Sequence, residues 1–310
     1  MLFTVGTRGS ELSLMQTNNV LKHLQSLNPG VEFQVKVIKT FGDKDQSQSL
    51  FALDRKGIFE KEIDQAIENE EVDFAVHSLK DVPILEHSET TIAAIPKRNS
   101  PHDVLISKDN ISFAELPQGA VIGTSSLRRM AQVKNLRSDL QIKPIRGNVD
   151  TRIKKVNKGE FDAVIVAEAG LNRLGLQNKI TERFSLEQFS PSAGQGALAL
   201  AAKQGNESVI EILESINHTP SQAEITAERS LVLGLEGGCR VPIGTIGRAN
   251  GNKLTFFACV FSLDGQTKII SSSTGALEDA QLLGKKVAKN LIQQGAKDLE
   301  AEWREKYGSW

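Results

Sequence analysis

Residues 120–130, AVIGTSSLRRM, contain the structural unit that decides this fold. The apolar run over residues 120–122 predicts a short buried strand. The hydroxyl-rich segment Thr124-Ser125-Ser126 follows it and leads into a helix that begins with two arginines. Short apolar runs alternate with helical patterns along most of the chain, which is typical of α/β architecture. The sequence therefore predicts an α/β fold.

The predicted elements fall into three groups. Strands are predicted at residues 2–5, 33–37, 74–76, 92–95, 104–106, 142–145, 163–166 and 197–201, with amphipathic helices between them. Segments rich in Pro, Gly, Ser and Asn near residues 96–103 and 190–196 indicate crossings between two lobes. After residue 218 the pattern changes to a helix, a loop over 236–244, two strands joined by a turn at Asp264-Gly265, and a final helix. We expect three domains: an α/β lobe of residues 1–98 with 196–217, a second α/β lobe of 99–195, and a C-terminal α+β domain of 218–310.

Composition is typical of an ordinary globular protein. The chain has 310 residues and a net charge of −1, which gives no reason to expect a nucleic-acid partner. No stretch approaches the roughly 20 apolar residues of a membrane span, and the first residues show no secretory signal pattern. The two cysteines do not indicate a disulfide scaffold at this chain length. We expect a cytoplasmic monomer without a membrane partner.

Arginines are concentrated in one part of the sequence. Seven of the 14 arginines lie between residues 121 and 190, and several stand beside glycines and hydroxyls where a strand leads into a helix. A helix N-terminus attracts anions, and the guanidinium fork matches carboxylate and phosphate. For each arginine alone, a capped helix with a solvent-facing side chain is the alternative. Together they predict a polyanionic ligand in a cleft between the lobes. The positions concerned are Thr124, Ser126, Arg128, Arg129, Arg146, Arg152, Arg173 and, in the first lobe, Arg8 with Ser10.

Two further segments carry chemically capable residues. Lys80 and Asp81 stand where a predicted buried strand gives way to a loop, and are either a surface ion pair or a functional site. His77 in that strand is expected to be structural. Cys239 follows two glycines and precedes Arg240, as reactive cysteines do, although the residues alone leave a structural role open. Cys259 lies in an apolar strand and is expected to be buried. No other Cys or His has metal-ligand spacing, so no metal is expected.

Eight segments, in the same order and spacing over nearly the whole chain, resemble motifs of the porphobilinogen deaminase family. They are Thr7-Arg8-Gly9-Ser10 with Gln16, Lys56-Gly57-Ile58-Phe59, His77-Ser78-Leu79-Lys80-Asp81-Val82-Pro83, Gly123-Thr124-Ser125-Ser126-Leu127-Arg128-Arg129, Arg146-Gly147-Asn148-Val149-Asp150-Thr151-Arg152, Ala169-Gly170-Leu171-Asn172-Arg173-Leu174-Gly175, Gly194-Gln195-Gly196 and Glu236-Gly237-Gly238-Cys239.

This resemblance implies a transferase that condenses four porphobilinogen molecules to the linear tetrapyrrole hydroxymethylbilane with release of ammonia. It implies two lobes like those of periplasmic binding proteins, and a dipyrromethane cofactor attached to Cys239. It makes Asp81 the catalytic acid. The cofactor-binding positions that it implies are Lys80, Ser10, Ser78, Thr124, Ser126, Arg128, Arg129, Arg146, Arg152 and Arg173, and the substrate-binding positions are Arg8, Lys56, Arg146, Arg152 and Arg173.

These residue types suit the chemistry. Each porphobilinogen carries two carboxylates, so the product chain is a growing polyanion that bidentate arginines would position. A buried carboxylate near the pyrrole N–H groups would stabilise the positive charge that develops there and could shuttle protons.

Four positions depart from the family pattern: Glu11, Arg55, Glu168 and Arg240. Glu168 places a carboxylate near Arg173 in sequence and is expected to weaken one ligand contact of that arginine. The competing hypothesis is a two-lobed binding module for an acidic metabolite, which explains the arginines but not the Gly-Gly-Cys loop.

Overall fold

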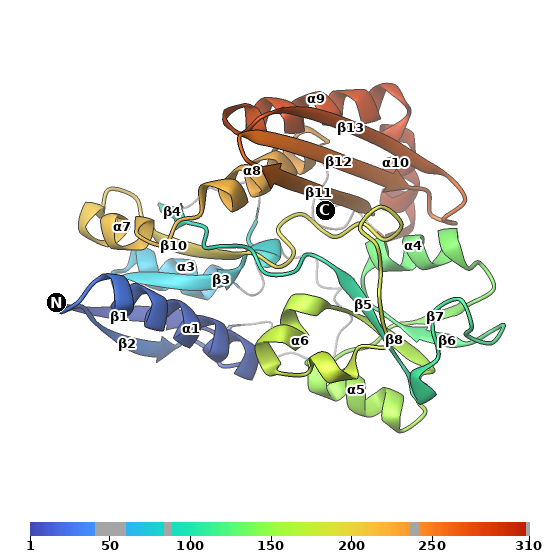
Figure 1. The fold of residues 1–310 in the computed structure, drawn as a ribbon, viewed down its shortest axis with the longest axis horizontal. Coiled ribbons are helices and arrows are strands. Elements are labelled where there is room, and N and C mark those ends of the chain that lie inside the picture. Colours follow the sequence, from blue (N-terminus) through green and yellow to red (C-terminus); the bar gives the residue numbers. More distant parts are fainter. Residues whose placement is uncertain (41–59, 84–88, 236–241, 308–310) are drawn as a thin grey trace. The chain divides into compact units, whose positions relative to one another are not determined.

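The computed structural model describes residues 1–40, 60–83, 89–235 and 242–307, which form two compact units (Figure 1). Unit 1 comprises Met1–Asn99 and Gly196–Gln222, and unit 2 comprises Ser100–Gln195 and Ala223–Trp310.

Unit 1 is a five-stranded sheet with helices on both faces. Its strands are β1 (Leu2–Thr7), β2 (Glu32–Val37), β3 (Phe74–Ser78), β4 (Thr90–Ala94) and β10 (Leu198–Lys203), in the order β2-β1-β3-β10-β4. Strands β1, β2 and β3 are parallel, and β10 runs antiparallel to β3 and β4. Its helices are α1 (Glu11–Leu27), α3 (Lys61–Glu68), the single 3-10 turn η1 (Leu79–Asp81) and α7 (Glu207–Glu214).

Two apolar clusters hold unit 1 together. Leu24 of α1 and Leu213 of α7 pack with Phe74 on one face of the sheet. Ile63 and Ile67, four residues apart on α3, cover the other face, as their helical spacing predicts.

Unit 2 contains a second sheet of the same kind. Its strands are β5 (Asp103–Ser107), β6 (Val121–Gly123), β7 (Gln141–Lys143), β8 (Ala163–Ala167) and β9 (Glu182–Arg183), in the order β7-β6-β8-β5-β9. Strands β6, β7 and β8 are parallel, and β5 is antiparallel to β8 and β9. Its helical segments are η2 (Lys108–Asn110), α4 (Leu127–Leu136), α5 (Val149–Asn157), α6 (Glu168–Leu174) and η3 (Gln177–Lys179). Val133 of α4 packs on one face, and Val156 of α5 with Leu171 of α6 on the other.

The C-terminal part of unit 2 has a separate antiparallel sheet. It comprises β11 (Ile243–Asn250), β12 (Lys253–Phe261) and β13 (Lys268–Ala276), with α8 (Thr219–Gly234), η4 (Leu277–Asp279), α9 (Ala280–Gln293) and α10 (Ala296–Tyr307). The buried Trp303 indole donates to Phe261 O at 2.9 Å and fixes α10 to β12. The predicted α/β class with a C-terminal α+β part is confirmed, whereas the domain boundary at residue 218 stays a prediction.

The sequence prediction missed β11, β9 and α10. Strand β11 begins within the predicted loop over 236–244. Its glycines serve close packing: a Cβ on Gly244 would lie 2.5 Å from Ser190 Cβ, and one on Gly247 would lie 2.8 Å from Glu224 Cα. No helix among the described residues is long and apolar enough to cross a membrane.

Candidate functional site

Three parallel strands of unit 2 end at the same edge of their sheet, and each leads into a helix that carries arginine. Strand β6 leads into α4, β7 into α5, and β8 into α6. The start of β5 lies at this edge too, because Asp103 pairs with Ala167 in the antiparallel register. The edge therefore gathers five predicted site arginines: Arg128, Arg129, Arg146, Arg152 and Arg173.

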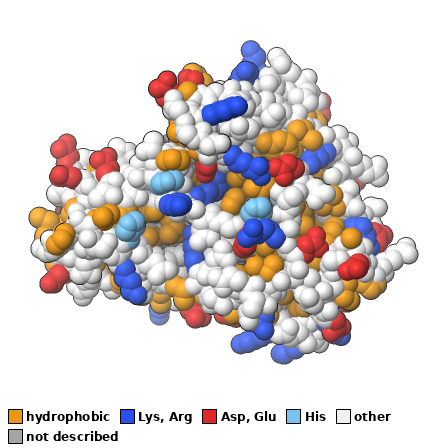
Figure 2. Space-filling view, in the orientation of Figure 1, with side chains coloured by type: hydrophobic (Ala, Val, Ile, Leu, Met, Phe, Trp, Pro, Cys, Tyr) orange, Lys and Arg blue, Asp and Glu red, His pale blue; other side chains and the backbone are white. Residues whose placement is uncertain are grey.

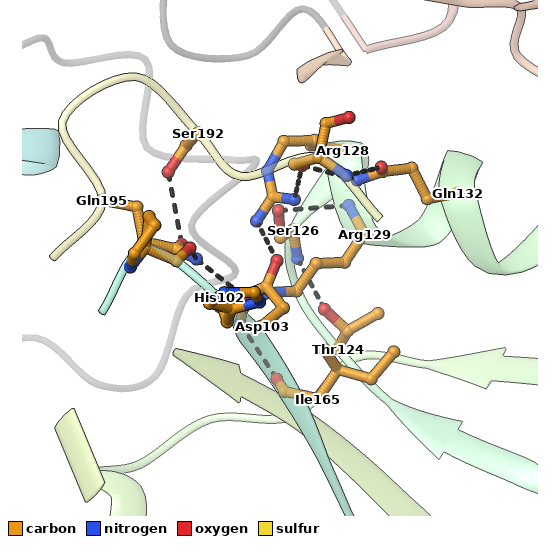
Figure 3. Close-up of polar contacts among 12 residues, drawn as sticks. His102, Asp103, Thr124, Ser126, Arg128, Arg129, Gln132, Ile165, Ser192 and Gln195 are labelled. Atoms are coloured by element: carbon orange, nitrogen blue, oxygen red, sulfur yellow. Dashed lines mark hydrogen bonds and ion pairs between the residues drawn. The ribbon is translucent and has the colours of Figure 1, made fainter. Parts of the chain in front are cut away.

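Arg128 and Arg129 are buried and share one carboxylate (Figure 3). Arg128 Nη2 donates to Asp103 Oδ2 at 2.7 Å, and Arg129 donates to Oδ1 through Nη2 at 2.7 Å and Nε at 3.2 Å. Burial alone would raise the pKa of Asp103, but the two guanidiniums outweigh it and hold this pKa at about 2. Two cations thus share one ionised acid.

The remaining donors of the pair are only partly satisfied. Arg129 Nη1 donates to Ile165 O at 2.9 Å, and Arg128 Nη1 donates to Ser190 O. Arg128 Nε is buried and has no hydrogen-bond partner among the described residues. An unsatisfied buried donor costs about 1–3 kcal/mol. The edge therefore retains capacity to bind an acceptor.

The predicted hydroxyls cap the helix. Ser126 is the N-cap of α4, and its Oγ accepts from Arg129 N at 3.4 Å. Thr124 Oγ1 accepts from Ser126 N at 3.2 Å. The capped-helix alternative is correct for these hydroxyls, but solvent-facing arginines are not what the structure shows at positions 128 and 129.

The other three arginines are partly buried. Arg152 Nε donates to Gly147 O at 2.9 Å, and burial, with a smaller effect from the charge of Arg129, lowers the Arg152 pKa to about 10. Burial also lowers the pKa of Arg173 to about 10, and Arg146 Nη2 is buried without a hydrogen-bond partner in the described chain. Arg152 and Arg173 stay charged at neutral pH while losing part of their hydration, which favours a bound anion.

The loop between Arg146 and α5 requires glycine. Gly147 has φ +108°, and a Cβ there would lie 2.6 Å from Thr151 Cγ2. Both the backbone conformation and the lack of space therefore require glycine at position 147.

Glu168 does not bind where the sequence suggested. Its buried carboxylate accepts from Arg183 Nε at 3.0 Å and from Ser100 Oγ. The structure engages this acid with Arg183, and burial is the cause of the Arg173 pKa shift. The expected weakening of Arg173 by Glu168 is therefore not supported, because proximity in sequence did not predict the partner.

Unit 1 places its predicted residues at one edge of its own sheet. Arg8 follows β1, and Lys80 with Asp81 follows β3, which is parallel to β1. Ser10 caps α1 and accepts from Ser13 N at 3.2 Å, whereas Ser78 accepts from Gln16 Nε2 at 3.2 Å.

Asp81 is exposed, whereas the chemistry suggested a buried carboxylate. It is the last residue of η1, directly after a strand whose first four residues are buried. An acid without a buried partner remains in water, because desolvating its charge is costly. The 3-10 turn that follows β3 therefore ends in an accessible acid.

His77 precedes this turn inside β3. It is buried, and burial, with a smaller effect from the Arg8 charge, lowers its pKa to about 4. Asp64 Oδ1 lies 3.8 Å from His77 Nε2. A neutral, buried ring agrees with the structural role expected for it.

Cys239 and Lys56, with Arg55 and Arg240, lie outside the described residues. Cys259 is fully buried in β12, as predicted, and burial raises the pKa of its thiol, which disfavours the reactive thiolate. Sequence reasoning missed Asp103, although an acid at the start of the apolar run Val104-Leu105-Ile106 was a visible signal. The described residues contain no group of three or more His, Cys, Asp or Glu able to hold a metal.

Comparison with known proteins places two family descriptions on the chain. "Porphobilinogen deaminase, dipyromethane cofactor binding domain" matches residues 3–211, and "Porphobilinogen deaminase, C-terminal domain" matches residues 222–293.

Similar curated proteins cover the whole chain. A "Probable porphobilinogen deaminase" of Nitrosopumilus maritimus is 46% identical over 310 residues, which are 100% of this chain and 99% of that protein. The porphobilinogen deaminase of Desulforudis audaxviator is 43% identical over 300 residues, 97% of each chain. Among solved structures, a periplasmic binding protein of Salmonella typhimurium with high arginine specificity aligns with 69% of this chain and 91% of its own, at 12% identity and a TM-score of 0.39.

Proposed function

The chain belongs to the porphobilinogen deaminase family, and from this premise we propose that it condenses four porphobilinogen molecules to hydroxymethylbilane with release of ammonia. The observation that carries the proposal is the match to both family domains, which together span residues 3–211 and 222–293. The arginine-rich edge of unit 2 supports it chemically, because substrate and product carry several carboxylates.

The residues at this edge fit a dipyrromethane cofactor, whose pyrroles bear carboxylates. Arg128 and Arg129 bring two positive charges against the one negative charge of Asp103. Arg128 Nε and Arg146 Nη2 are buried donors without a partner in the described chain. A carboxylate ligand would satisfy both deficits with charge-assisted hydrogen bonds.

We assign the binding roles accordingly. When bound, the cofactor supplies the pyrrole carbon from which the tetrapyrrole is extended. The thiol of Cys239 would carry it. The side chains that would hold cofactor carboxylates are Lys80, Arg128, Arg129, Arg146, Arg152 and Arg173.

Hydroxyls assist the arginines in this assignment. Ser126 and Thr124 each accept a backbone N–H, and a hydroxyl that accepts still has its own proton to donate. Ser10 accepts from Ser13 N and shares a second hydrogen bond of 2.7 Å with the Ser13 hydroxyl, and it retains a proton to donate where Ser13 is the donor of that bond. Ser78 accepts from Gln16 Nε2 and likewise keeps its own proton to donate. Each would donate to a ligand oxygen while keeping its place in the fold.

Substrate carboxylates would be held by Arg8 and Lys56, together with Arg146, Arg152 and Arg173. Arg8 follows β1, and η1 with Asp81 follows the parallel strand β3, so the same sheet edge supplies a cation for the substrate carboxylate and an acid for the reacting centre.

Asp81 would act on the reacting groups. Its carboxylate would stabilise positive charge on a pyrrole nitrogen and move protons at the leaving amine and at the pyrrole α-carbon. Its exposure leaves it available to a substrate, because it is not used in a buried pair as Asp103 is.

Localisation and assembly remain proposals as well. We propose a cytoplasmic monomer without nucleic-acid or membrane partners. The net charge of −1 supports the lack of a nucleic-acid partner. On the face drawn in Figure 2, basic side chains are interspersed with acidic and apolar ones. Light scattering on a sizing column would test the monomer.

The intact mass of freshly purified protein tests the function. We expect a mass above that of the 310-residue chain by one dipyrromethane, mapped to the Cys239 peptide, together with consumption of porphobilinogen. A binding module for an acidic metabolite would have the plain sequence mass and no turnover. That result would reject the proposed function.

A further inference from the structure

We propose that Asp103 is a positioning residue for this reaction: it fixes Arg128 and Arg129 in one arrangement and leaves their site a single net positive charge. This inference rests on the proposed function, because the carboxylates that the arginines would bind are those of the dipyrromethane. Asp103 itself is fully buried and would act through the two arginines.

The hydrogen bonds of Asp103 determine which edge of each guanidinium is available. Among the described side chains, Asp103 accepts four hydrogen bonds, three from the arginines and one from Gln195 Nε2 at 3.0 Å. The Nε–Nη2 edge of Arg129 faces this carboxylate, and its Nη1 is held by a main-chain carbonyl. For Arg128 the two terminal nitrogens are occupied and Nε is left over. The acid therefore selects the donor that remains for a ligand.

The same carboxylate limits the repulsion among the cations of this edge. Arg128 and Arg129 meet on its two oxygens, and the charge of Arg129 is felt by Arg152, whose pKa it helps to lower. Without Asp103, two buried guanidiniums would have no counter-charge. Each would turn toward any other acceptor, since an unpaired buried charge is costly.

The network also fixes the main chain around the arginines (Figure 3). Gln195 Nε2 donates to Pro101 O at 2.7 Å as well as to Asp103. Gln132 accepts from Ser190 N at 2.6 Å, and its Nε2 donates to Ser190 O at 3.1 Å. Segments 100–103 and 190–195 of unit 2 are thereby joined to the arginine pair. This rigidity is what a preorganised carboxylate site requires.

Asp103→Asn tests the proposal, with Asp139→Asn as the matched control. Asp139 also forms a 2.7 Å ion pair with an arginine of unit 2, Arg137, but that pair is partly exposed and outside the site. The first readout is the fraction of purified full-length chain at the cofactor-loaded mass. We expect D103N to load at least about tenfold less than the wild type, because charged hydrogen bonds are lost, and D139N to load normally.

The second readout separates positioning from simple structural support. We expect sodium sulfate to raise the Tm of D103N more than that of the wild type or D139N, relative to sodium chloride at equal ionic strength. The sulfate dianion would replace the missing counter-charge of the two arginines. A purely structural Asp103 would lower the Tm equally in both salts.

A folded D103N protein that loads cofactor and responds to sulfate like the wild type would overturn the proposal. If D103N does not fold, Asp103→Glu keeps the charge and displaces it by one methylene. We expect the glutamate variant to fold and load poorly, and normal loading would overturn the proposal. Failure of both variants to fold would also reject it, in favour of a structural role. A wild-type protein without adduct or turnover would instead reject the proposed function itself.

Discussion

The two α/β sheets both carry charged residues where their parallel strands end, but they differ in how far those residues are buried and paired. In each, parallel strands end at one edge and lead into loops and helices with charged residues. At the edge of unit 2, Arg128 and Arg129 are buried and held by Asp103. At the edge of unit 1, Asp81 is exposed. The groups proposed to hold a ligand are thus fixed by a buried acid, and the group proposed to act on reacting atoms is left accessible.

Removing the covalent attachment should have the largest effect. Cys239→Ala is expected to have no adduct and no turnover, because the carboxylates that the arginines hold would lack their anchor. Cys259→Ala is the control: its thiol is fully buried, so adduct and turnover should persist. Intact mass and porphobilinogen consumption are the measurements. An active Cys239→Ala protein would show that the unit 2 edge does not serve a covalent cofactor.

The sequence predicts these edges well because strand ends are local features. The apolar run before Thr124 and the one before Lys80 locate their loops without knowledge of the fold. The Asp103 pairing is not local: 25 residues separate it from Arg128, and they meet because β5 runs antiparallel to β8. The partner of Glu168 was not predicted for the same reason, since Glu168 begins α6 and Arg183 lies in β9. To predict which side chains pair between distant segments, one must know how the strands are aligned in the sheet, and the periodicity of the sequence does not give that alignment.

The accessible acid should produce the next largest effect. Asp81→Asn is expected to fold normally and to lose turnover at least about 100-fold, because the amide keeps the shape but neither stabilises positive charge nor accepts the proton. Asp81→Glu should retain a small activity, since its charge survives in a displaced position.

The control is Asp109→Asn, which changes a second Lys-Asp pair on a 3-10 turn. Lys108 and Asp109 lie on η2 after β5, in unit 2. Positive φ at Asp109 tolerates asparagine. Porphobilinogen consumption by each variant, with circular dichroism for folding, is the measurement. Equal turnover in D81N and D109N would reject the proposed role of Asp81.

Within unit 2, Arg128→Leu and Arg146→Leu should separate structural from ligand-binding cations. Loss of Arg128 removes its charged hydrogen bond to Asp103, which keeps Arg129 as a partner, and should cost about 1.5–3 kcal/mol of unfolding free energy as well as cofactor loading. Arg146 Nη2 lacks a partner in the described chain, so Arg146→Leu should leave stability nearly unchanged. Its loading should weaken by about 1.5–3 kcal/mol through the lost charged hydrogen bond.

Urea unfolding and intact mass distinguish the two arginines. Arg128→Lys should also load poorly, because an ammonium cannot reproduce the fork. Normal loading by both leucine variants would contradict a polyanion site at this edge.

The smallest effect is a pair of pH windows, one for each edge. His77 is neutral and buried in unit 1, with a pKa of about 4 against an ordinary value near 6.5. Between pH 6.5 and 4 the unfolded chain binds a proton at His77 and the folded chain does not. The contribution of the neutral His77 ring to the free energy of unfolding is therefore complete above pH 6.5 and is lost as pH falls toward 4. One pKa unit corresponds to about 1.4 kcal/mol, so the loss amounts to roughly 3 kcal/mol. Asp103 behaves alike at lower pH: its contribution, about 2 kcal/mol, is complete above about pH 4 and lost toward its pKa of about 2. The difference in unfolding free energy between the wild type and His77→Gln should therefore shrink between pH 6.5 and 4, whereas the difference between the wild type and Asp103→Asn should stay constant there and shrink only below pH 4. Urea titrations followed by circular dichroism at half-unit pH steps would resolve the two windows. If the difference in unfolding free energy between the wild type and His77→Gln were constant from pH 7 to 4, the pKa of His77 would not be lowered by burial, and the pH window assigned to unit 1 would be wrong.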